Sequence, residues 1–287
     1  MFSTLISAQE LAHIKDQAKL VIVDCRHDLM DAAAGKNAYD AGHIAGAMFA
    51  NLDQDLSGPK VGSDGKFQGR HPLPQTDNLI SALRRFGIDH DSQVVTYDAH
   101  GGMFAARLWW LLRSIGHSAV AVLDGGVAAW SALGHALQTE SPQPALGNIE
   151  VRVALTRQVD VTQVLVSLNA AADQTFQVVD ARAADRFRGE NETIDPIGGH
   201  IPGAVNRFFK DNLDANGLFK LPQQLREEWL SKIRDPQSAV MQCGSGVTAC
   251  HNLLALEVAG LSGAALYPGS WSEWCADASR PVATGPN

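Results

Sequence analysis

Short apolar runs alternate with longer segments of helical periodicity along the whole chain. In the N-terminal half, β-branched residues dominate the run 20–24, and the runs 94–97 and 119–123 are similar, so each predicts a buried strand. A segment with apolar residues at helical spacing, 102–113, separates the last two runs and ends near Gly116. Strands that alternate with helices predict a parallel sheet that is covered by helices on both faces.

The first predicted helix begins at a capping signal. Ser7 can cap a helix, and Glu10 stands three residues later, where the reciprocal bond of a capping box is made. The apolar periodicity that follows predicts a helix that continues to about Leu20.

The C-terminal half shows the same order of elements. The segment 156–168 predicts a helix, and the segment 251–259 predicts another that leads to a glycine. The runs 176–180, 239–241 and 264–266 predict short strands. The second half therefore predicts a second α/β unit of the same kind.

Three sequence pieces recur in the same order in both halves, which indicates a tandem duplication. They are Asp24-Cys25-Arg26 with Asp180-Ala181-Arg182, Gly42-His43-Ile44-Ala45-Gly46-Ala47 with Gly199-His200-Ile201-Pro202-Gly203-Ala204, and Leu123-Asp124-Gly125-Gly126 before Trp130 with Leu266-Tyr267-Pro268-Gly269 before Trp274. We predict an N-terminal domain at 1–133, a linker at 134–147 that carries two prolines, and a C-terminal domain at 148–287.

A glycine-rich loop with a cysteine at its start carries the clearest chemical signal. Cys243 ends an apolar run, and the loop Gly244-Ser245-Gly246 leads into the helical segment. Backbone N–H groups of such a loop converge as a nest, with a helix N-terminus behind them, and favour an anion such as a thiolate. At the matching position the first half holds Asp98, so we expect the first domain to be catalytically silent.

Composition excludes several classes of function. The 287 residues are 45% hydrophobic and 19% charged with a net charge of -8, and no Lys/Arg-rich tract occurs, which argues against nucleic acid as a partner. No apolar run approaches the roughly 20 residues of a membrane span, and no signal peptide is recognisable. Four cysteines in a chain of this length do not form a disulfide framework, so we expect reduced thiols and a cytoplasmic protein.

The cysteines and histidines do not predict a metal site. No Cys-x-x-Cys occurs, and Cys25 and Cys275 have no partner at metal-ligand spacing. His43 and His200 recur in both halves, so we interpret them as packing or turn residues. Cys250 and the six tryptophans are interpreted as core residues, and no cofactor is expected.

These motifs together resemble the tandem-domain rhodanese (sulfurtransferase) family over nearly the whole chain. The Gly-His-Ile-x-Gly-Ala element in both halves, Leu-Asp-Gly-Gly-x-x-x-Trp in the first half and the cysteine loop carry the resemblance. Cys-Gly-Ser-Gly-Val-Thr-Ala resembles the loop of the 3-mercaptopyruvate sulfurtransferase branch, because thiosulfate-preferring members usually place basic residues directly after the cysteine. The resemblance implies two rhodanese-like α/β domains, with the active site in the second.

The resemblance also implies a covalent mechanism. Cys243 would take the outer sulfur of a small anionic donor, hold it as a persulfide and transfer it to a thiol or to cyanide. N–H groups of the loop from Gly244 to Thr248, which includes Ser245, Gly246 and Val247, would stabilise the thiolate and the persulfide.

Three further side chains match a serine–histidine–aspartate relay of mercaptopyruvate sulfurtransferases. Ser245 lies two residues after the cysteine, and the matching partners are His71 and Asp53 of the first half. Their role would be proton transfer as pyruvate departs through its enolate. The alternative is that Ser245 is only a small loop residue, Asp53 a helix cap and His71 a surface histidine.

Arginines are the candidate ligands for the donor's anionic group. Arg186 matches a family arginine of this role, and Arg188 is a second candidate. Mercaptopyruvate sulfurtransferases typically carry a further arginine a few residues later, but this chain has an acidic segment at 190–195 instead. Arg70, beside His71, is a hypothetical substitute for it.

Two questions of function stay open at this point. The donor is 3-mercaptopyruvate or thiosulfate, and the acceptor is a thiol or dithiol such as thioredoxin, or cyanide. A cysteine phosphatase of the Cys-x5-Arg type is disfavoured because Ala249 stands where the arginine is needed. A non-catalytic binding module is disfavoured by the intact nucleophile.

Overall fold

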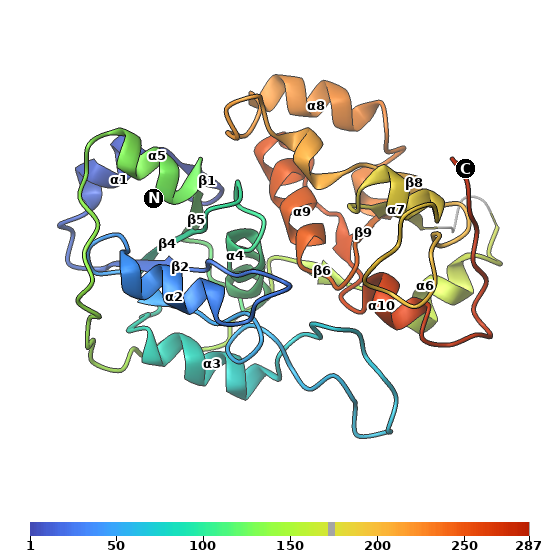
Figure 1. The fold of residues 1–287 in the computed structure, drawn as a ribbon, viewed down its shortest axis with the longest axis horizontal. Coiled ribbons are helices and arrows are strands. Elements are labelled where there is room, and N and C mark those ends of the chain that lie inside the picture. The colour runs from blue at the N-terminus through green and yellow to red at the C-terminus, as the bar shows by residue number, and fades with distance from the viewer. Residues whose placement is uncertain (172–175, 287) are drawn as a thin grey trace. The chain divides into compact units, whose positions relative to one another are not determined.

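The chain forms two five-stranded parallel sheets, each in its own compact unit (Figure 1). The computed structural model describes residues 1–171 and 176–286. Unit 1 comprises Met1–Ser57, Pro74–Leu155 and Asp214–Phe219, whereas unit 2 comprises Gly58–Leu73, Thr156–Leu213 and Lys220–Asn287. A segment from the N-terminal half, Gly58–Leu73, therefore packs with the C-terminal half.

The sheet of unit 1 has the strand order β1-β5-β4-β2-β3, and all its paired strands are parallel. In the middle of the sheet, Val95 pairs with Ile22 on one side and Ala121 on the other. The strands are β1 (Leu5–Ile6), β2 (Leu20–Asp24), β3 (Met48–Phe49), β4 (Gln93–Tyr97) and β5 (Val120–Leu123).

Helices cover the two faces of this sheet. Alternate strand residues such as Ile22 and Val95 pack with Leu11 and Trp130 in one core cluster. On the opposite face Thr96 donates its hydroxyl to the carbonyl of Ala105, at the start of α4. The helices are α1 (Ala8–Ile14), α2 (Ala34–Ala41), α3 (Thr76–Arg85), α4 (Ala105–Ser114) and α5 (Gly126–Ala132).

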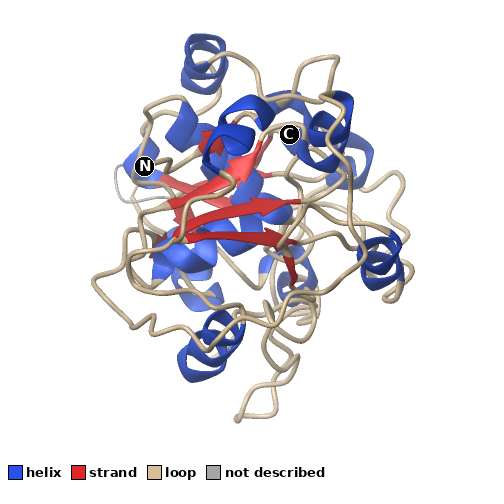
Figure 2. Ribbon diagram, turned by 90° about the vertical axis from the view of Figure 1, so that its left-hand side faces the viewer, coloured by secondary structure: helices blue, strands red, loops and turns tan. Residues whose placement is uncertain are grey.

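Unit 2 repeats this topology with the strand order β6-β10-β9-β7-β8, and its paired strands in the described residues are again all parallel. Figure 2 colours the helices of the chain blue and its strands red. Its strands are β6 (Arg157–Gln158), β7 (Gln177–Asp180), β8 (Val205–Asn206), β9 (Ala239–Gln242) and β10 (Ala265–Leu266). Its helices are α6 (Val161–Ser167), α7 (Ala184–Arg188), α8 (Pro222–Leu230), α9 (Thr248–Val258) and α10 (Ser270–Trp274), with 3-10 turns at η1 (Phe209–Asn212) and η2 (Pro236–Ser238). The predicted pair of α/β domains with parallel sheets is confirmed.

Two predicted helices are shorter than their apolar patterns suggested. The capping box of Ser7 and Glu10 is present, but α1 ends at Ile14, because the next residues are largely polar and lead into β2. The predicted helix 156–168 was wrong at its start: β6 comes first, and a capping box at Asp160 then begins α6. Tertiary pairing of β6 with β10 decides this segment.

The third repeat match is also corrected by one residue. The strand pairings align Val122 with Leu266. Val122 pairs with Thr96, which is the last residue but one of β4, and Leu266 pairs with Met241, which is the last residue but one of β9. The helices that follow agree with this alignment, because α5 begins at Gly126 and α10 at Ser270.

The repeated motifs have the same structural roles in both units. Arg182 forms a two-pronged ion pair with Asp180 and donates to the carbonyl of Gly199 at 2.6 Å, and Arg26 bonds Asp24 and Gly42 in the same way. The two histidines of the repeats stack on aromatic rings, His43 on Tyr39 and His200 on Phe187, and the ring centroids of each pair are 3.8 Å apart. The interpretation of these residues as packing elements is therefore confirmed.

The predicted linker segment, 134–147, lies on unit 1 without a helix or strand of its own in the described chain. It is held by backbone hydrogen bonds between His43 and Gln138 and from Gly147 to Arg84. Among the helices of the described residues, none combines the length and the apolar character that a membrane crossing requires.

Candidate active site at the Cys243 loop

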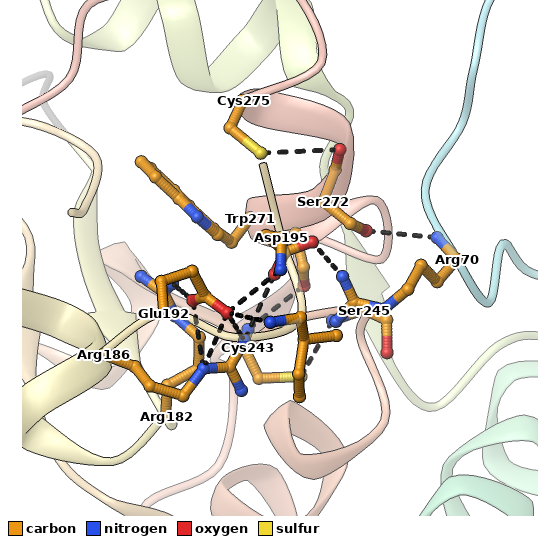
Figure 3. Close-up of polar contacts among 12 residues, drawn as sticks. Arg70, Arg182, Arg186, Glu192, Asp195, Cys243, Ser245, Trp271, Ser272 and Cys275 are labelled. Carbon is orange, nitrogen blue, oxygen red and sulfur yellow. Dashed lines mark hydrogen bonds and ion pairs between the residues drawn. The ribbon is translucent and has the colours of Figure 1, made fainter. Parts of the chain in front are cut away.

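Cys243 is the first residue after β9, and its sulfur lies inside a nest of backbone donors. The residue is 2% exposed, and Sγ accepts hydrogen bonds from the N–H groups of Ser245 at 3.5 Å and Gly246 at 3.1 Å (Figure 3). Gly246 has a φ of 78°, and a Cβ there would lie 2.3 Å from the carbonyl oxygen of Pro268, so only glycine fits. Two of the predicted loop donors therefore point at the sulfur.

The turn before α10 braces this loop from behind. The N–H of Cys243 donates to Ser270 Oγ at 3.1 Å, and the N–H groups of Trp271 and Ser272 donate to the carbonyls of Cys243 and Gly244 at 3.0 and 2.9 Å. Sequence reasoning missed Ser270. The available signal was its place in the repeat, since it stands where the first half has Gly126.

Ser245 and His71 meet in unit 2 although they lie 174 residues apart in sequence. Ser245 Oγ and His71 Nδ1 are 2.8 Å apart, and both residues are 6% exposed. The segment Gly58–Leu73 is anchored beside the loop by the N–H of Arg70, which donates to Ser272 Oγ at 3.1 Å (Figure 3). The structure thus brings together two of the three residues of the predicted relay.

The third predicted member of the relay, Asp53, belongs to unit 1. Its side chain is exposed, and its backbone N–H donates to Asn51 Oδ1 at 2.9 Å. The role of Asp53 in the relay stays a prediction.

Two guanidinium groups lie beside the loop, over Gly244. A Cβ at this glycine would be 2.6 Å from Nη2 of Arg70 and 3.7 Å from Nη2 of Arg186. Arg186 comes from α7 and Arg70 from the segment that also carries His71. The predicted donor ligand Arg186 and the hypothetical substitute Arg70 are therefore both adjacent to the residue that follows Cys243.

Two carboxylates hold these arginines in place. Glu192 receives hydrogen bonds from Arg186 at 3.0 and 2.9 Å, and Asp195 bridges the two guanidiniums, pairing with Arg70 and with Arg186 at 3.2 Å. The side chains of Glu192 and Asp195 are 4% and 2% exposed. The acidic segment noted in the sequence thus fills the space around the arginine pair.

The two carboxylates differ in how well their charge is supported. Burial would raise the pKa of Glu192, but hydrogen bonds from Arg186 and from the N–H groups of Asp195 and Ile194 lower it below its usual range. Burial raises the pKa of Asp195 above its usual value, and the nearby charges of Arg70 and Arg186 offset this only in part. The negative charge of Asp195 is therefore less well stabilised than that of Glu192.

Arg188, the weaker donor-binding candidate, lies at the surface. Its guanidinium pairs with Glu190 at 2.8 and 2.7 Å, and within the described chain no contact joins it to the cysteine loop. Val247 is buried at the N-cap of α9, and Thr248 is the first residue of that helix.

The other cysteines lie in the core, as expected for Cys250. Cys250 is fully buried and donates to the carbonyl of Gly246 at 3.3 Å. Burial raises the pKa of Cys275 to about 11 and that of Cys25 well above its usual value, so both stay protonated near neutral pH. Throughout the residues that the structure describes, no three His, Cys, Asp or Glu side chains are grouped to hold a metal ion.

Comparison with known proteins assigns the chain to a family. The family model of the rhodanese-like domain matches it twice, at residues 7–133 and 164–277. The chain belongs to the rhodanese family. The two matched regions contain Asp98 and Cys243 respectively, so this family match includes both loops of the duplication.

Relatives cover the rhodanese chain almost end to end. A Pseudomonas aeruginosa protein named "Probable 3-mercaptopyruvate sulfurtransferase" is 44% identical over 98% of both chains. Mouse thiosulfate sulfurtransferase is 34% identical and covers 83% of this chain and 79% of its own length. In a solved structure, 3-mercaptopyruvate sulfurtransferase from Leishmania major matches with a TM-score of 0.83 at 30% identity, over 96% of this chain and 74% of its own.

Proposed function

We propose that this rhodanese-family sulfurtransferase takes sulfur from 3-mercaptopyruvate through a persulfide on Cys243. The observation that carries the proposal is the nest of backbone donors around Cys243 Sγ. The sulfur accepts hydrogen bonds from the N–H groups of Ser245 and Gly246. Such donors stabilise a thiolate before the reaction and a persulfide after it. Sulfur transfer is also common to the names of the relatives, whereas the donor differs between them.

In the first half-reaction the Cys243 thiolate attacks the thiol sulfur of the donor. A sulfur–sulfur bond forms, the carbon–sulfur bond breaks, and the electron pair of that bond stays on carbon as the enolate of pyruvate. The enzyme then carries Cys243 persulfide, and the enolate takes a proton to become pyruvate. Arg186 is suited to hold the donor carboxylate, because a guanidinium binds a carboxylate with two parallel hydrogen bonds.

Ser245 and His71 are suited to deliver that proton. Their 2.8 Å contact allows the imidazole to supply a proton to the serine hydroxyl as the hydroxyl protonates the enolate. We place Asp53 as the third member of this relay. Thiosulfate leaves sulfite, which needs no protonation, so the relay favours a mercaptopyruvate donor.

In the second half-reaction an acceptor removes the outer sulfur. Cyanide attacks it and leaves as thiocyanate, which restores the Cys243 thiolate. A dithiol such as that of thioredoxin forms its own disulfide and releases hydrogen sulfide. N–H groups from Gly244, Val247 and Thr248, with those of Ser245 and Gly246, would hold the outer sulfur meanwhile. Arg188 would act at a distance by attracting the anionic donor.

We also propose a cytoplasmic location and a division of labour in the chain. Of the four cysteines, all are free and buried, which suits a reducing compartment. In the proposed division, domain 148–287 carries the nucleophile and domain 1–133 is silent, with 134–147 between them.

The deciding experiment is kcat/KM for 3-mercaptopyruvate and for thiosulfate, each with cyanide and with a dithiol acceptor. We expect mercaptopyruvate to be preferred by at least about tenfold, since one relay of general acid catalysis is worth that much or more. A clear preference for thiosulfate would overturn the choice of donor, and no transfer from either donor would overturn the function.

A further inference from the structure

The arginine pair over Gly244 already holds an anion of the protein itself. The carboxylate of Asp195 lies between Arg70 and Arg186 and pairs with both. It is almost fully buried, with 2% of its side chain exposed, whereas the two arginine side chains are 23% and 19% exposed. A donor that approaches Gly244 therefore meets two guanidiniums whose charge is partly neutralised.

The charges around this pair balance. Ion pairs connect three guanidinium and three carboxylate groups: Arg70, Arg182, Arg186, Asp180, Glu192 and Asp195. Because the cluster is neutral as a whole, it gains little from a second negative charge on a donor. Thiosulfate is a dianion near neutral pH, and 3-mercaptopyruvate is a monoanion.

We propose that Asp195 is a specificity-determining residue, which sets the charge of this cluster so that a monoanionic carboxylate donor is accepted over a dianion. Arg70 and Arg186 form the donor-binding pair, and the carboxylate between them lowers their combined attraction for anions. This inference rests on the proposed function only for the identity of the donor, since the anion preference is a property of the cluster.

The neighbouring acid, Glu192, does not have this role. It is tied to Arg182 as well as Arg186, and it accepts the N–H groups of Ile194 and Asp195 at 2.9 and 3.0 Å. Its loss would leave backbone donors without a partner inside the protein. Asp195 can lose its charge at a lower cost, because burial raises its pKa, so Asp195→Asn is the informative change.

Asp195→Asn leaves the cluster with one excess positive charge. At an effective dielectric constant of about 20, such a charge strengthens binding by on the order of tenfold for each negative charge on the ligand. We expect kcat/KM to rise about tenfold for 3-mercaptopyruvate and about a hundredfold for thiosulfate, so their ratio moves about tenfold toward thiosulfate. Arg70→Gln leaves one excess negative charge and should move the same ratio in the opposite direction.

The double variant Asp195→Asn with Arg70→Gln restores a neutral cluster. Its donor ratio should return toward that of the unmodified protein, although both donors bind less tightly without the guanidinium. The matched control is Asp211→Asn, which removes the same charge from an exposed residue of unit 2 and should leave the ratio unchanged. Raising the salt concentration should reduce the changes in the donor ratio, because salt screens the charge of the cluster.

A binding measurement separates this inference from the proposed reaction. Sulfate and pyruvate, a dianion and a monoanion that donate no sulfur, are titrated calorimetrically into the full-length protein and its variants. A selective gain for sulfate in Asp195→Asn supports the inference, even if sulfur transfer itself fails. Equal changes for both anions, or a gain for pyruvate alone, would overturn it while leaving sulfur transfer intact. If Asp195→Asn does not fold, the opposite shift in Arg70→Gln decides the matter.

Discussion

The loops after β4 and β9 occupy matching places in the two sheets, and each surrounds one side chain with backbone donors. In unit 1, Asp98 accepts four N–H groups, from His100 and Gly102 on Oδ1 and from Phe104 and Ala105 on Oδ2, at 2.7–3.0 Å. In unit 2 the place of Asp98 is taken by a thiol, which accepts two.

The difference indicates that the same arrangement of backbone donors supports stability in one copy and, under the proposed function, chemistry in the other. A carboxylate that occupies four donors leaves none of them for a ligand, and it closes the loop as a permanent internal cap. In the proposed mechanism the sulfur of Cys243 is the nucleophile, and the donors around it would follow the charge onto a persulfide. Under the proposed function, the residue at the end of one strand in each sheet would decide which copy reacts.

The largest effect is expected for the nucleophile itself. Cys243→Ala should abolish transfer from both donors, by at least about four orders of magnitude, because among the described residues no other thiol lies in a donor nest. Thiocyanate formation measures this loss. The matched control is Cys250→Ala, which removes a core cysteine and should keep transfer in the folded protein. Residual turnover in Cys243→Ala would contradict the assignment of the nucleophile.

The next effect concerns stability in the copy that carries Asp98. Asp98→Ala removes the acceptor of four backbone N–H groups and should lower the free energy of unfolding by about 3–5 kcal/mol. Urea unfolding followed by tryptophan fluorescence measures this change. Asp98→Asn keeps one oxygen acceptor and should lose less. If both variants are as stable as the unmodified protein, the carboxylate is not a structural cap.

A smaller effect is expected at the proposed relay. Ser245→Ala should reduce kcat/KM about a hundredfold with 3-mercaptopyruvate, whose enolate must be protonated, and only a few fold with thiosulfate. Steady-state kinetics with each donor measures the difference. Ser245→Thr retains the hydroxyl and serves as the control. Equal losses on both donors would exclude the relay.

The smallest effect tests the brace behind the loop. Ser270 has a φ of 55°, and Gly126 at the matching position has a φ of 57°. Because a residue with a side chain rarely adopts a positive φ, the backbone at Ser270 is strained. Ser270→Gly removes the strain together with the bond to the Cys243 N–H, and stability should change by less than about 1 kcal/mol. Ser270→Ala removes the bond but keeps the strain, and should be less stable than the glycine variant. The reverse order in unfolding midpoints would show that the backbone at Ser270 is not strained, and a Ser270→Ala variant as stable as the unmodified protein would show that the hydroxyl has no bracing role.

Much of the fold was predictable because both halves follow the same local rules. Runs such as 20–24 and 239–241 are short, apolar and bounded by polar residues, so strand formation is dictated locally. The two-residue strand β6 was not predictable, because its conformation comes from pairing with β10 rather than from its own composition. The helix end at Ile14 and the one-residue shift of the third repeat likewise depend on where strands pair.

The sequence by itself determined the duplication, the parallel α/β architecture and the thiol that we propose as the nucleophile, because these follow from periodicity, repeated motifs and a glycine loop at the end of a strand. Only the tertiary structure decided which side chains meet that thiol. His71 and Arg70 reach the Cys243 loop through the segment Gly58–Leu73, which packs with unit 2, and no local pattern records such a long-range packing. Charge balance around Gly244 is also a property of the folded chain, since Arg70 and Asp195 lie 125 residues apart and become one electrostatic unit only when burial brings them together.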